Sequence, residues 1–217
     1  DDDAEAEPGW LEALAAAFDR HPEAGVIGGP ILLRDPESPP FWYEQAAKPF
    51  LSHLNPPLAG YAEARHWGEF PWGANWAARR RCLLEIGGFR MRFGRGASGV
   101  ASGEDVAAAA LIQRAGYRIG FEPAARVRHL VEPDRFRLRE IRRAVFEHRR
   151  AVYELEKCGY IPMETAFRAS AAKGLALLAQ GIFLIRQTSF QRFERLMRGG
   201  AELAAAVRFL GDYLRRL

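Results

Sequence analysis

Apolar residues follow helical and extended spacing in turn along the first 133 residues. Leu11, Leu14 and Phe18 recur at helical intervals after Pro8, a residue type that favours the first turn of a helix. The run 25–33 is apolar throughout and bounded by Gly and Pro, which predicts one buried strand. Similar patterns predict a turn that leads into a strand over 71–78, and two further strands over 117–121 and 125–130. A short helix is predicted over 80–86 and a longer one over 103–115. The pattern therefore predicts a mixed α/β fold.

The pattern becomes purely helical after Pro133. Residues 135–157 place Leu138, Ile141, Val145 and two later apolar residues on one face, and 164–186 is a second, more apolar stretch. A third helix is expected over 189–217, with a break at Gly199–Gly200. We therefore expect an α/β part, residues 1–133, followed by an α-helical tail, residues 134–217.

Composition and charge limit the protein classes that fit. The chain has 217 residues, 48% of them hydrophobic, which is typical of a globular protein of one domain with room for a helical appendage. Two cysteines, Cys82 and Cys158, do not make a disulfide framework, so a reducing compartment fits best. The formal net charge is +4 and only three of the basic residues are Lys. Arg is the better residue for contacts with phosphate and carboxylate groups.

Two adjacent carboxylates, Glu104 and Asp105, open the helix predicted after a glycine-rich loop at 89–103. Carboxylates at this position commonly cap a helix by accepting from its free N–H groups. A flexible loop before a fixed carboxylate is also what a gated active site needs. In that interpretation one carboxylate takes the proton of an attacking hydroxyl.

The chain opens on three acidic residues, Asp1 to Asp3. A D-x-D arrangement suits a hard divalent cation that keeps phosphate oxygens as its other ligands; the alternative is a solvated acidic terminus. His129 follows at the end of a predicted strand and is either structural or a neutral imidazole beside a metal or phosphate.

A turn at 72–75 supplies a different kind of contact. Gly73 and Ala74 allow close approach of a ligand to the backbone, and the Asn75 amide can donate or accept. Trp72 suits stacking on a sugar ring, with core packing as the alternative. Taken alone, the segment is only a turn.

The start of the tail is strongly basic. Residues 135–150 hold seven Arg against Glu140 and Glu147, a net charge of +5. On a helix with an apolar face, this charge suits an anionic membrane surface, and a solvated helix flank is the alternative. We expect no nucleic-acid partner, because no nucleic-acid motif is present and the aromatic residues are not interleaved with the Arg.

The apolar stretch 174–185 is too short for a comfortable membrane span, so an interfacial or packed helix is expected.

Seven short motifs become informative when they are taken in order. They are DDD-x4-PGWL from Asp1, GVIGG from Gly25, WGANWA-x-RR from Trp72, EIGGF from Glu85, GEDV from Gly103, RAGY-x-I from Arg114 and EP-x3-V-x-HL from Glu122. In this order they resemble the second half of family 2 glycosyltransferases, which have the GT-A fold. The resemblance covers residues 1–133 and implies inverting transfer of a sugar from a nucleotide-sugar donor to a hydroxyl of a sugar or lipid-linked acceptor.

The resemblance also implies roles for individual residues. Asp1 and Asp3 match the D-x-D motif that meets Mg²⁺ or Mn²⁺ on the donor diphosphate, and His129 matches a histidine near that metal. Asp105 matches the catalytic base, with Glu104 beside it near the acceptor. The remaining matches form the glycine loop beside the donor sugar and acceptor: Gly73, Ala74 and Asn75, preceded by Trp72.

Two departures from the family pattern change the expectation. The family's first half, which carries the nucleoside-binding region, does not precede Asp1, so we expect the N-terminally truncated GT-A chain to be inactive by itself. Processive members carry a Q-x-x-R-W motif in later helices, but all five Trp lie at or before Trp76. We therefore expect a non-processive enzyme of cell-envelope polysaccharide or glycolipid synthesis, cytoplasmic and peripheral at the inner face of the cell membrane.

Two other classes of protein share some of these features. A non-catalytic, membrane-associated interaction module with a vestigial acidic motif remains an alternative. A nicotinamide-dependent dehydrogenase would need G-x-G-x-x-G between a strand and a helix. The run Gly28-Gly29-Pro30 does not supply it.

Overall fold

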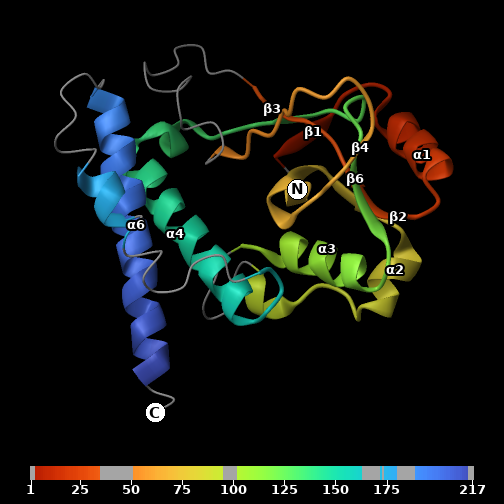
Figure 1. Cartoon of the computed structure of the whole chain (residues 1–217). Helices are drawn as coiled ribbons and strands as arrows, with labels where there is room; N and C mark the ends of the chain where they lie inside the picture. The colour runs from red at the N-terminus through yellow and green to blue at the C-terminus, as the bar shows by residue number, and fades with distance from the viewer. Residues whose placement is uncertain are drawn as a thin grey trace.

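The described part of the protein is a mixed α/β structure with a helical pair at one side (Figure 1). It is a computed structural model, and it describes residues 3–34, 51–94, 102–162, 172, 174–179 and 189–214. Helix α6 and its neighbour α4 stand at the left in this view, and the two sheets with helices α1 to α3 lie to the right. The mixed α/β class predicted from the sequence is thus observed.

The larger sheet has four strands in the order β4-β6-β2-β5. Its central strands, β2 (Ala24–Gly28) and β6 (Arg118–Phe121), are parallel, and β5 (Trp76–Ala78) and β4 (Ala62–Glu63) pair antiparallel on the outside. All five residues of β2 are buried. A parallel strand covered on both faces is expected to be apolar throughout, which explains the continuous run in the sequence.

Successive residues of β2 contact helices on opposite faces of this sheet. Val26 packs in a cluster with residues of α3 (Glu104–Arg114), whereas Ile27 packs with residues of α1 (Trp10–Arg20). This division follows from the two-residue repeat of a strand. The sheet is therefore the middle of three layers, with α3 packed against one face of β2 and β6. The short helix α2 (Arg80–Glu85) packs beside α3.

The apolar run 25–33 forms two strands, and the prediction of one strand is wrong. At Gly29–Pro30 the chain leaves the larger sheet, and β3 (Ile31–Leu33) joins a second sheet in the order β1-β7-β3. In that sheet β7 (Val127–His129) pairs antiparallel with β1 (Ala4–Ala6) and parallel with β3. An added Cβ at Gly29 would overlap the backbone carbonyl of Ala125, so a residue without a side chain permits this crossing.

The helical pair consists of α4 (Leu138–Lys157) and α6 (Ser189–Leu214). A 3₁₀ turn, η6 (Pro133–Phe136), precedes α4, so the helix begins three residues later than predicted. The guanidinium of Arg149 is buried between the carboxylates of Glu202 on α6, at 3.0 Å, and Glu156, at 3.6 Å. This buried charge cluster joins the two helices at one register.

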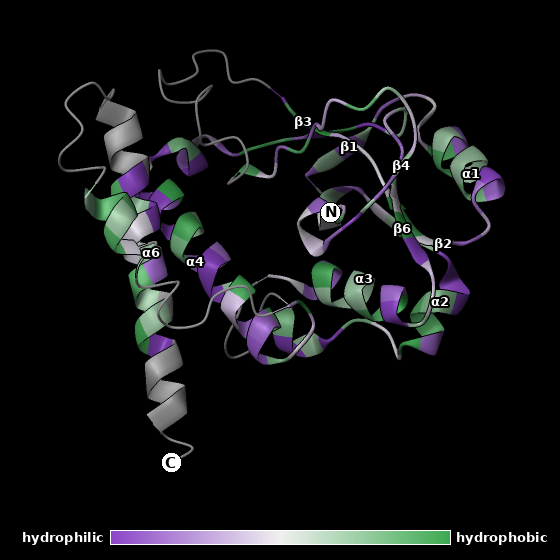
Figure 2. Cartoon of the chain, viewed as in Figure 1, coloured by the Kyte–Doolittle hydropathy of each residue, from purple (hydrophilic) through white to green (hydrophobic). Residues whose placement is uncertain are grey.

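The predicted break at Gly199–Gly200 is wrong, because α6 continues through both residues. An added Cβ at Gly199 would meet Leu178 and the carbonyl of Gly174, and one at Gly200 would meet the ring of Phe146. The glycines therefore allow neighbouring segments to approach α6 closely. In Figure 2, hydrophilic (purple) and hydrophobic (green) residues alternate along α4, as expected of an amphipathic helix.

The end of α4 attaches the helical pair to the α/β part. Leu155 and Ile161 share a buried cluster with Phe93, in the turn η5 (Met91–Phe93), and Ala107 of α3. The predicted helix 164–186 lies mostly outside the described residues, of which 172 and 174–179 are helical. Among the helices that the structure describes, none combines the length and apolar character needed to cross a membrane.

Candidate active site

Asp105 lies in the first turn of α3 and contacts the turn η4 (Gly73–Asn75), which is 32 positions earlier in the chain. The Gly73 N–H donates to Asp105 Oδ2 at 2.7 Å, and the Val106 N–H donates to Oδ1 at 2.8 Å. Gly103 caps the helix with a φ of +107°, a conformation that favours glycine. The carboxylate is thus held at a positive helix end with lone pairs left for a ligand.

Burial raises the pKa of Asp105, and the hydrogen bonds from the Val106 and Gly73 N–H groups offset part of this rise. Desolvation disfavours the charged carboxylate, whereas a bond donated to that carboxylate favours it. A raised pKa makes a carboxylate a stronger base once it is ionised. Asp105 therefore has the position and electrostatics of a group that accepts a proton.

The neighbours of Asp105 differ in exposure. Gly73 is exposed, and an added Cβ there would lie 3.5 Å from Asp105 Oδ2, at ordinary contact distance. Its bare face therefore opens space in front of the carboxylate. Glu104, Ala74 and Trp72 are half-buried around the same contact, and their predicted ligand contacts stay predictions.

The Asn75 amide is buried and bonded to protein on three sides. Its Nδ2 donates to the carbonyls of Pro30, at 2.9 Å, and Ala125, at 2.8 Å, and its Oδ1 accepts from Trp10 Nε1 at 3.0 Å. Asn75 is 2% exposed. These bonds use both N–H groups of the amide and one lone pair of its oxygen, which leaves a single oxygen lone pair for any further contact. Asn75 thus joins three loops and fixes η4, the turn that presents the Gly73 N–H to Asp105.

Asp3 and His129 form a second pair, set by the register of β1 against β7. Ala4 lies opposite His129, and the Leu130 N–H donates to the Asp3 carbonyl at 2.7 Å. His129 Nε2 is 3.3 Å from Asp3 Oδ2, and the His129 side chain is 4% exposed. The other ring nitrogen, Nδ1, bonds to the carbonyl of Leu51 at 3.1 Å and must carry a proton there, because a carbonyl only accepts.

The position of the proton on His129 bears on whether Asp3 and His129 could bind a metal. With Nδ1–H held by a carbonyl, Nε2 is the ring nitrogen that faces Asp3 and the one whose lone pair a cation between the two groups would bind, an arrangement that histidine ligands of metals share. Imidazole and carboxylate together fit a divalent cation that takes its other ligands from water and phosphate. The described residues hold no group of three or more His, Cys, Asp or Glu with metal-binding geometry, and Asp1 lies outside them. The structure thus brings together two of the three residues predicted to bind a metal, and the metal itself stays a prediction.

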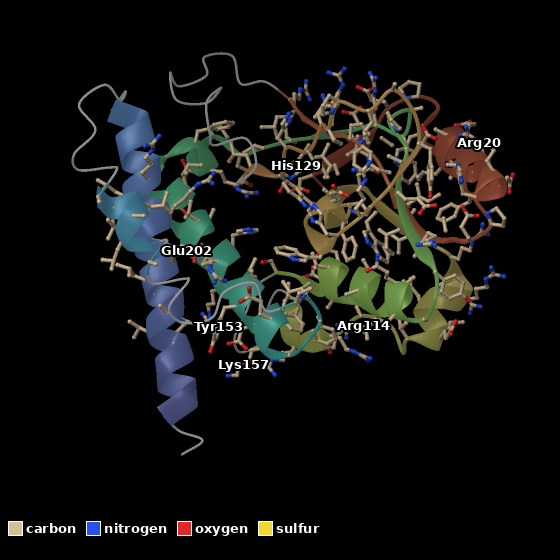
Figure 3. All side chains as sticks on the ribbon, in the orientation of Figure 1. Arg20, Arg114, His129, Tyr153, Lys157 and Glu202 are labelled. Carbon is tan, nitrogen blue, oxygen red and sulfur yellow. The ribbon has the colours of Figure 1, made fainter. Side chains whose placement is uncertain are left out.

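The structure connects the two pairs through packing. η4, which carries Gly73, packs against β7, which carries His129. The carbonyl of Pro30 accepts from both Asn75 Nδ2 and the Val127 N–H, at 2.9 and 3.0 Å, and so links the turn to the strand. Figure 3 shows His129 at the upper middle of the molecule, above α3 and apart from Tyr153 and Glu202 on the helical pair.

Sequence reasoning missed the residues that support these pairs. Trp10 was part of the motif PGWL, but its indole bond to Asn75 had no signal in the sequence. The carbonyls of Leu51, Pro30 and Ala125 are backbone groups, which residue identity does not reveal. These supports come from segments 45 to 78 residues away from their partners and are determined by tertiary structure.

Comparison with known proteins shows a similarity to part of a sugar-transferring enzyme. No family model matches the chain. The chain is 30% identical over 134 residues to the glucosyl-dolichyl phosphate glucuronosyltransferase of Haloferax volcanii, a match that takes in 59% of this chain. It spans 41% of the length of that curated relative. The chain is therefore similar to part of a glycosyltransferase.

Proposed function

We propose that the protein is a metal-dependent, inverting glycosyltransferase of the GT-A type, related to family 2. It moves one sugar from a nucleotide-sugar donor to a hydroxyl acceptor. The observation that carries the proposal is the Asp105 carboxylate, held by two backbone N–H groups with a raised pKa beside the exposed Gly73. The similarity to a sugar-transferring enzyme supports the same class.

Asp105 acts as the general base in this mechanism. The acceptor hydroxyl approaches across the bare face of Gly73 and gives its proton to a carboxylate oxygen as its own oxygen attacks the anomeric carbon. Because Gly73 and Val106 each hold one oxygen of Asp105, the carboxylate cannot rotate away from the acceptor. With Asp105 as the one carboxylate that takes part, the bond from the anomeric carbon to the nucleoside diphosphate breaks as the new bond to the acceptor oxygen forms, and this single displacement inverts the anomeric centre.

Asp3 and His129 are proposed to hold the metal on the donor diphosphate, with Asp1 as a further ligand. When bound, Mg²⁺ or Mn²⁺ supplies positive charge against the diphosphate leaving group. Leu51 holds the imidazole of His129 in the tautomer that leaves Nε2 toward Asp3. Glu104, Trp72 and Ala74 are proposed to line the donor and acceptor sites next to Asp105.

The substrates follow from the proposed class and the relative. The Haloferax enzyme is named for transfer to a glucosyl-dolichyl phosphate, which supports a lipid-linked sugar as the acceptor here. We propose one transfer per acceptor, in cell-envelope polysaccharide or glycolipid synthesis, with the protein peripheral at the cytoplasmic face of the membrane. A donor with a nucleoside diphosphate leaving group fits the Asp3–His129 pair.

Replacement of the base tests the proposal. In the whole protein, Asp105→Asn should lower the turnover of the best nucleotide-sugar donor by about 10² to 10⁴-fold. Donor binding, measured calorimetrically with Mn²⁺, should remain. Asp19→Asn, the same change at an exposed position of α1, is the matched control and should keep full turnover. Full turnover in Asp105→Asn would refute the base assignment, and absence of donor binding in the native protein would favour a non-catalytic interaction module.

A further inference from the structure

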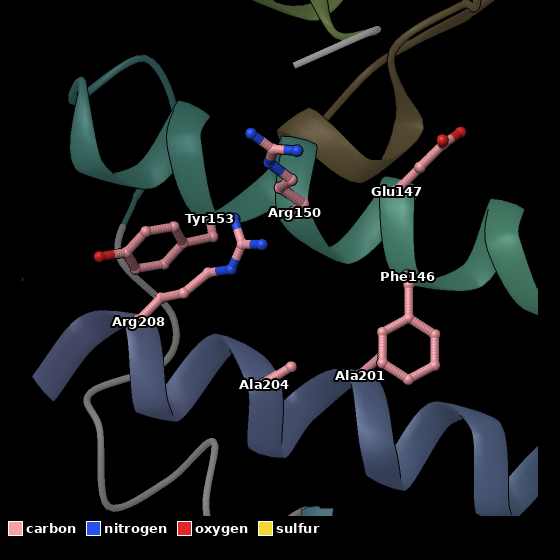
Figure 4. A pocket seen from close by; sticks show the side chains of 7 residues that line it. All are labelled: Phe146, Glu147, Arg150, Tyr153, Ala201, Ala204 and Arg208. Carbon is pink, nitrogen blue, oxygen red and sulfur yellow. The ribbon is translucent and has the colours of Figure 1, made fainter. Parts of the chain in front are cut away.

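A pocket of about 180 Å³ lies between α4 and α6, on the helical pair and apart from the Asp105–Gly73 contact (Figure 4). Ala201 and Ala204 of α6 provide small side chains opposite larger ones of α4, which leaves the space between the helices open. The lining residues are Phe146, Glu147, Arg150, Tyr153, Ala201, Ala204 and Arg208. The pocket thus combines aromatic and methyl surface with charged groups at its edge.

Two exposed guanidinium groups border this pocket. Within the described part of the chain, neither Arg150 nor Arg208 takes part in an ion pair. Glu147 also lines the pocket, but its carboxylate accepts from Arg143 Nε at 2.8 Å, which offsets its charge. The edge of the pocket is therefore positive, and guanidinium is the side chain that best fits phosphate oxygens.

The surface around the pocket is both basic and apolar. Arg142, Phe146 and Arg150 follow one another at one-turn spacing and share a face of α4. Phe146 is 37% exposed and Val207, next to Arg208 on α6, is 69% exposed. Exposed apolar residues among arginines are typical of a helix that lies at a charged lipid–water boundary.

The buried Arg149 cluster holds the pocket in shape. Arg149 points between Glu156 and Glu202, whereas its neighbour Arg150 lies on the exposed side of α4. A ligand therefore meets guanidinium groups carried on two helices of fixed register. A pre-formed site of this kind loses less entropy on binding than two free side chains would.

We infer that this pocket binds the phosphate headgroup of an anionic phospholipid and so docks the helical pair on a bilayer surface. Arg150 and Arg208 contact the phosphate, and the apolar lining of Phe146, Ala201 and Ala204 receives the glycerol and the first acyl carbons. Charge complementarity selects an anionic lipid over a zwitterionic one. The site extends the protein's interactions beyond the proposed sugar transfer and does not depend on Asp105.

Vesicle binding tests the two arginines. The purified protein should bind vesicles that mix phosphatidylglycerol into phosphatidylcholine and should bind pure phosphatidylcholine vesicles far more weakly, at one fixed salt concentration. The double variant Arg150→Gln/Arg208→Gln should bind the anionic vesicles about 30-fold more weakly. This factor corresponds to a loss of about 1 kcal/mol of binding free energy for each of the two arginines. The matched control, Arg80→Gln/Arg126→Gln, removes the same charge from exposed positions of the α/β part and should lose less than about threefold.

A steric variant separates the pocket from diffuse attraction by charge. Ala204→Leu fills the pocket without changing charge and should weaken binding to anionic vesicles about tenfold, whereas Ala15→Leu on the exposed face of α1 should not. Circular dichroism melting checks that each variant folds. Equal losses for the two Arg pairs, or unchanged binding of Ala204→Leu, would overturn the inference. Equal binding to both vesicle types, with a Kd for inorganic phosphate weakened by Ala204→Leu, would assign the pocket to a free anion and overturn it as well.

Discussion

Removal of the Asn75 amide should destabilise the protein through the three loops that it joins. Asn75→Ala deletes hydrogen bonds to Trp10, Pro30 and Ala125, with lengths of 3.0, 2.9 and 2.8 Å. At about 1 kcal/mol net for each bond, the free energy of unfolding should fall by about 3 kcal/mol. The Pro30 carbonyl keeps the Val127 N–H as a donor, and half-buried Trp10 can reach water, so the loss should not exceed about 4 kcal/mol.

A double-mutant cycle isolates the bond between Trp10 and Asn75. Trp10→Phe removes the indole N–H together with some packing in the cluster that includes Ile27 and Ala125, and that packing loss cancels in the cycle. Because both variants delete the same bond, Trp10→Phe/Asn75→Ala should be about 1 kcal/mol more stable than the sum of the single effects predicts. Urea unfolding followed by circular dichroism at a helix wavelength measures all four proteins.

The result that would refute this reasoning is specific. A loss below about 1 kcal/mol in Asn75→Ala would mean that the amide does not hold the loops. Strict additivity in the cycle would mean that the indole and the amide do not interact. Turnover gives a second readout, since displacement of η4 moves the Gly73 N–H away from Asp105.

Two further predictions concern close packing and pH. Gly29→Ala should destabilise the protein by about 1 to 3 kcal/mol, because its methyl group would overlap the backbone carbonyl of Ala125, whereas Gly60→Ala, with open space around it, should be neutral or slightly stabilising in the same urea assay. The rate of transfer should fall as pH drops through the raised pKa of Asp105, because the protonated carboxyl cannot accept the acceptor's proton. An acid limb of kcat/KM centred at or below about 3.9, the value for a free Asp, would contradict the raised pKa.

Local patterns in the sequence predicted most of the elements. Apolar spacing and terminal Gly residues located α1, α2 and α3 to within a few residues, and β6 and β7 followed from short apolar runs between turn residues. These signals are local because the period of side chains along a helix or strand is fixed by backbone geometry. The α/β fold class could therefore be predicted from the sequence without knowledge of the tertiary contacts.

The same local signals failed where distant segments set the geometry. The run 25–33 is apolar in both of its strands, so nothing in it marks the change of sheet at Gly29–Pro30. Gly199–Gly200 predicted a break on propensity alone, but the close approach of Gly174 and Phe146 explains glycine there instead. Propensity is a weak prior that tertiary packing overrides.

In the candidate site, too, the sequence indicated which residue types could carry chemistry, whereas their surroundings depended on tertiary packing. Residue type and motif order indicated Asp105, Asp3 and His129 as chemistry-bearing residues. The sequence could not tell that Asn75 faces the protein interior, or that Arg149 is buried in an ion pair while Arg150 beside it is exposed. Both distinctions depend on which side of a turn or helix meets another element.

By itself the sequence determined the kinds of elements, their order and the residue types able to bind a cation, accept a proton or meet an anionic surface, because these properties belong to single residues and short repeats. Tertiary structure decided which of those residues meet. Asp105 receives the Gly73 N–H and Asp3 lies beside His129 because strands and turns far apart in the chain pack together, and burial then changes the chemistry of the groups they enclose.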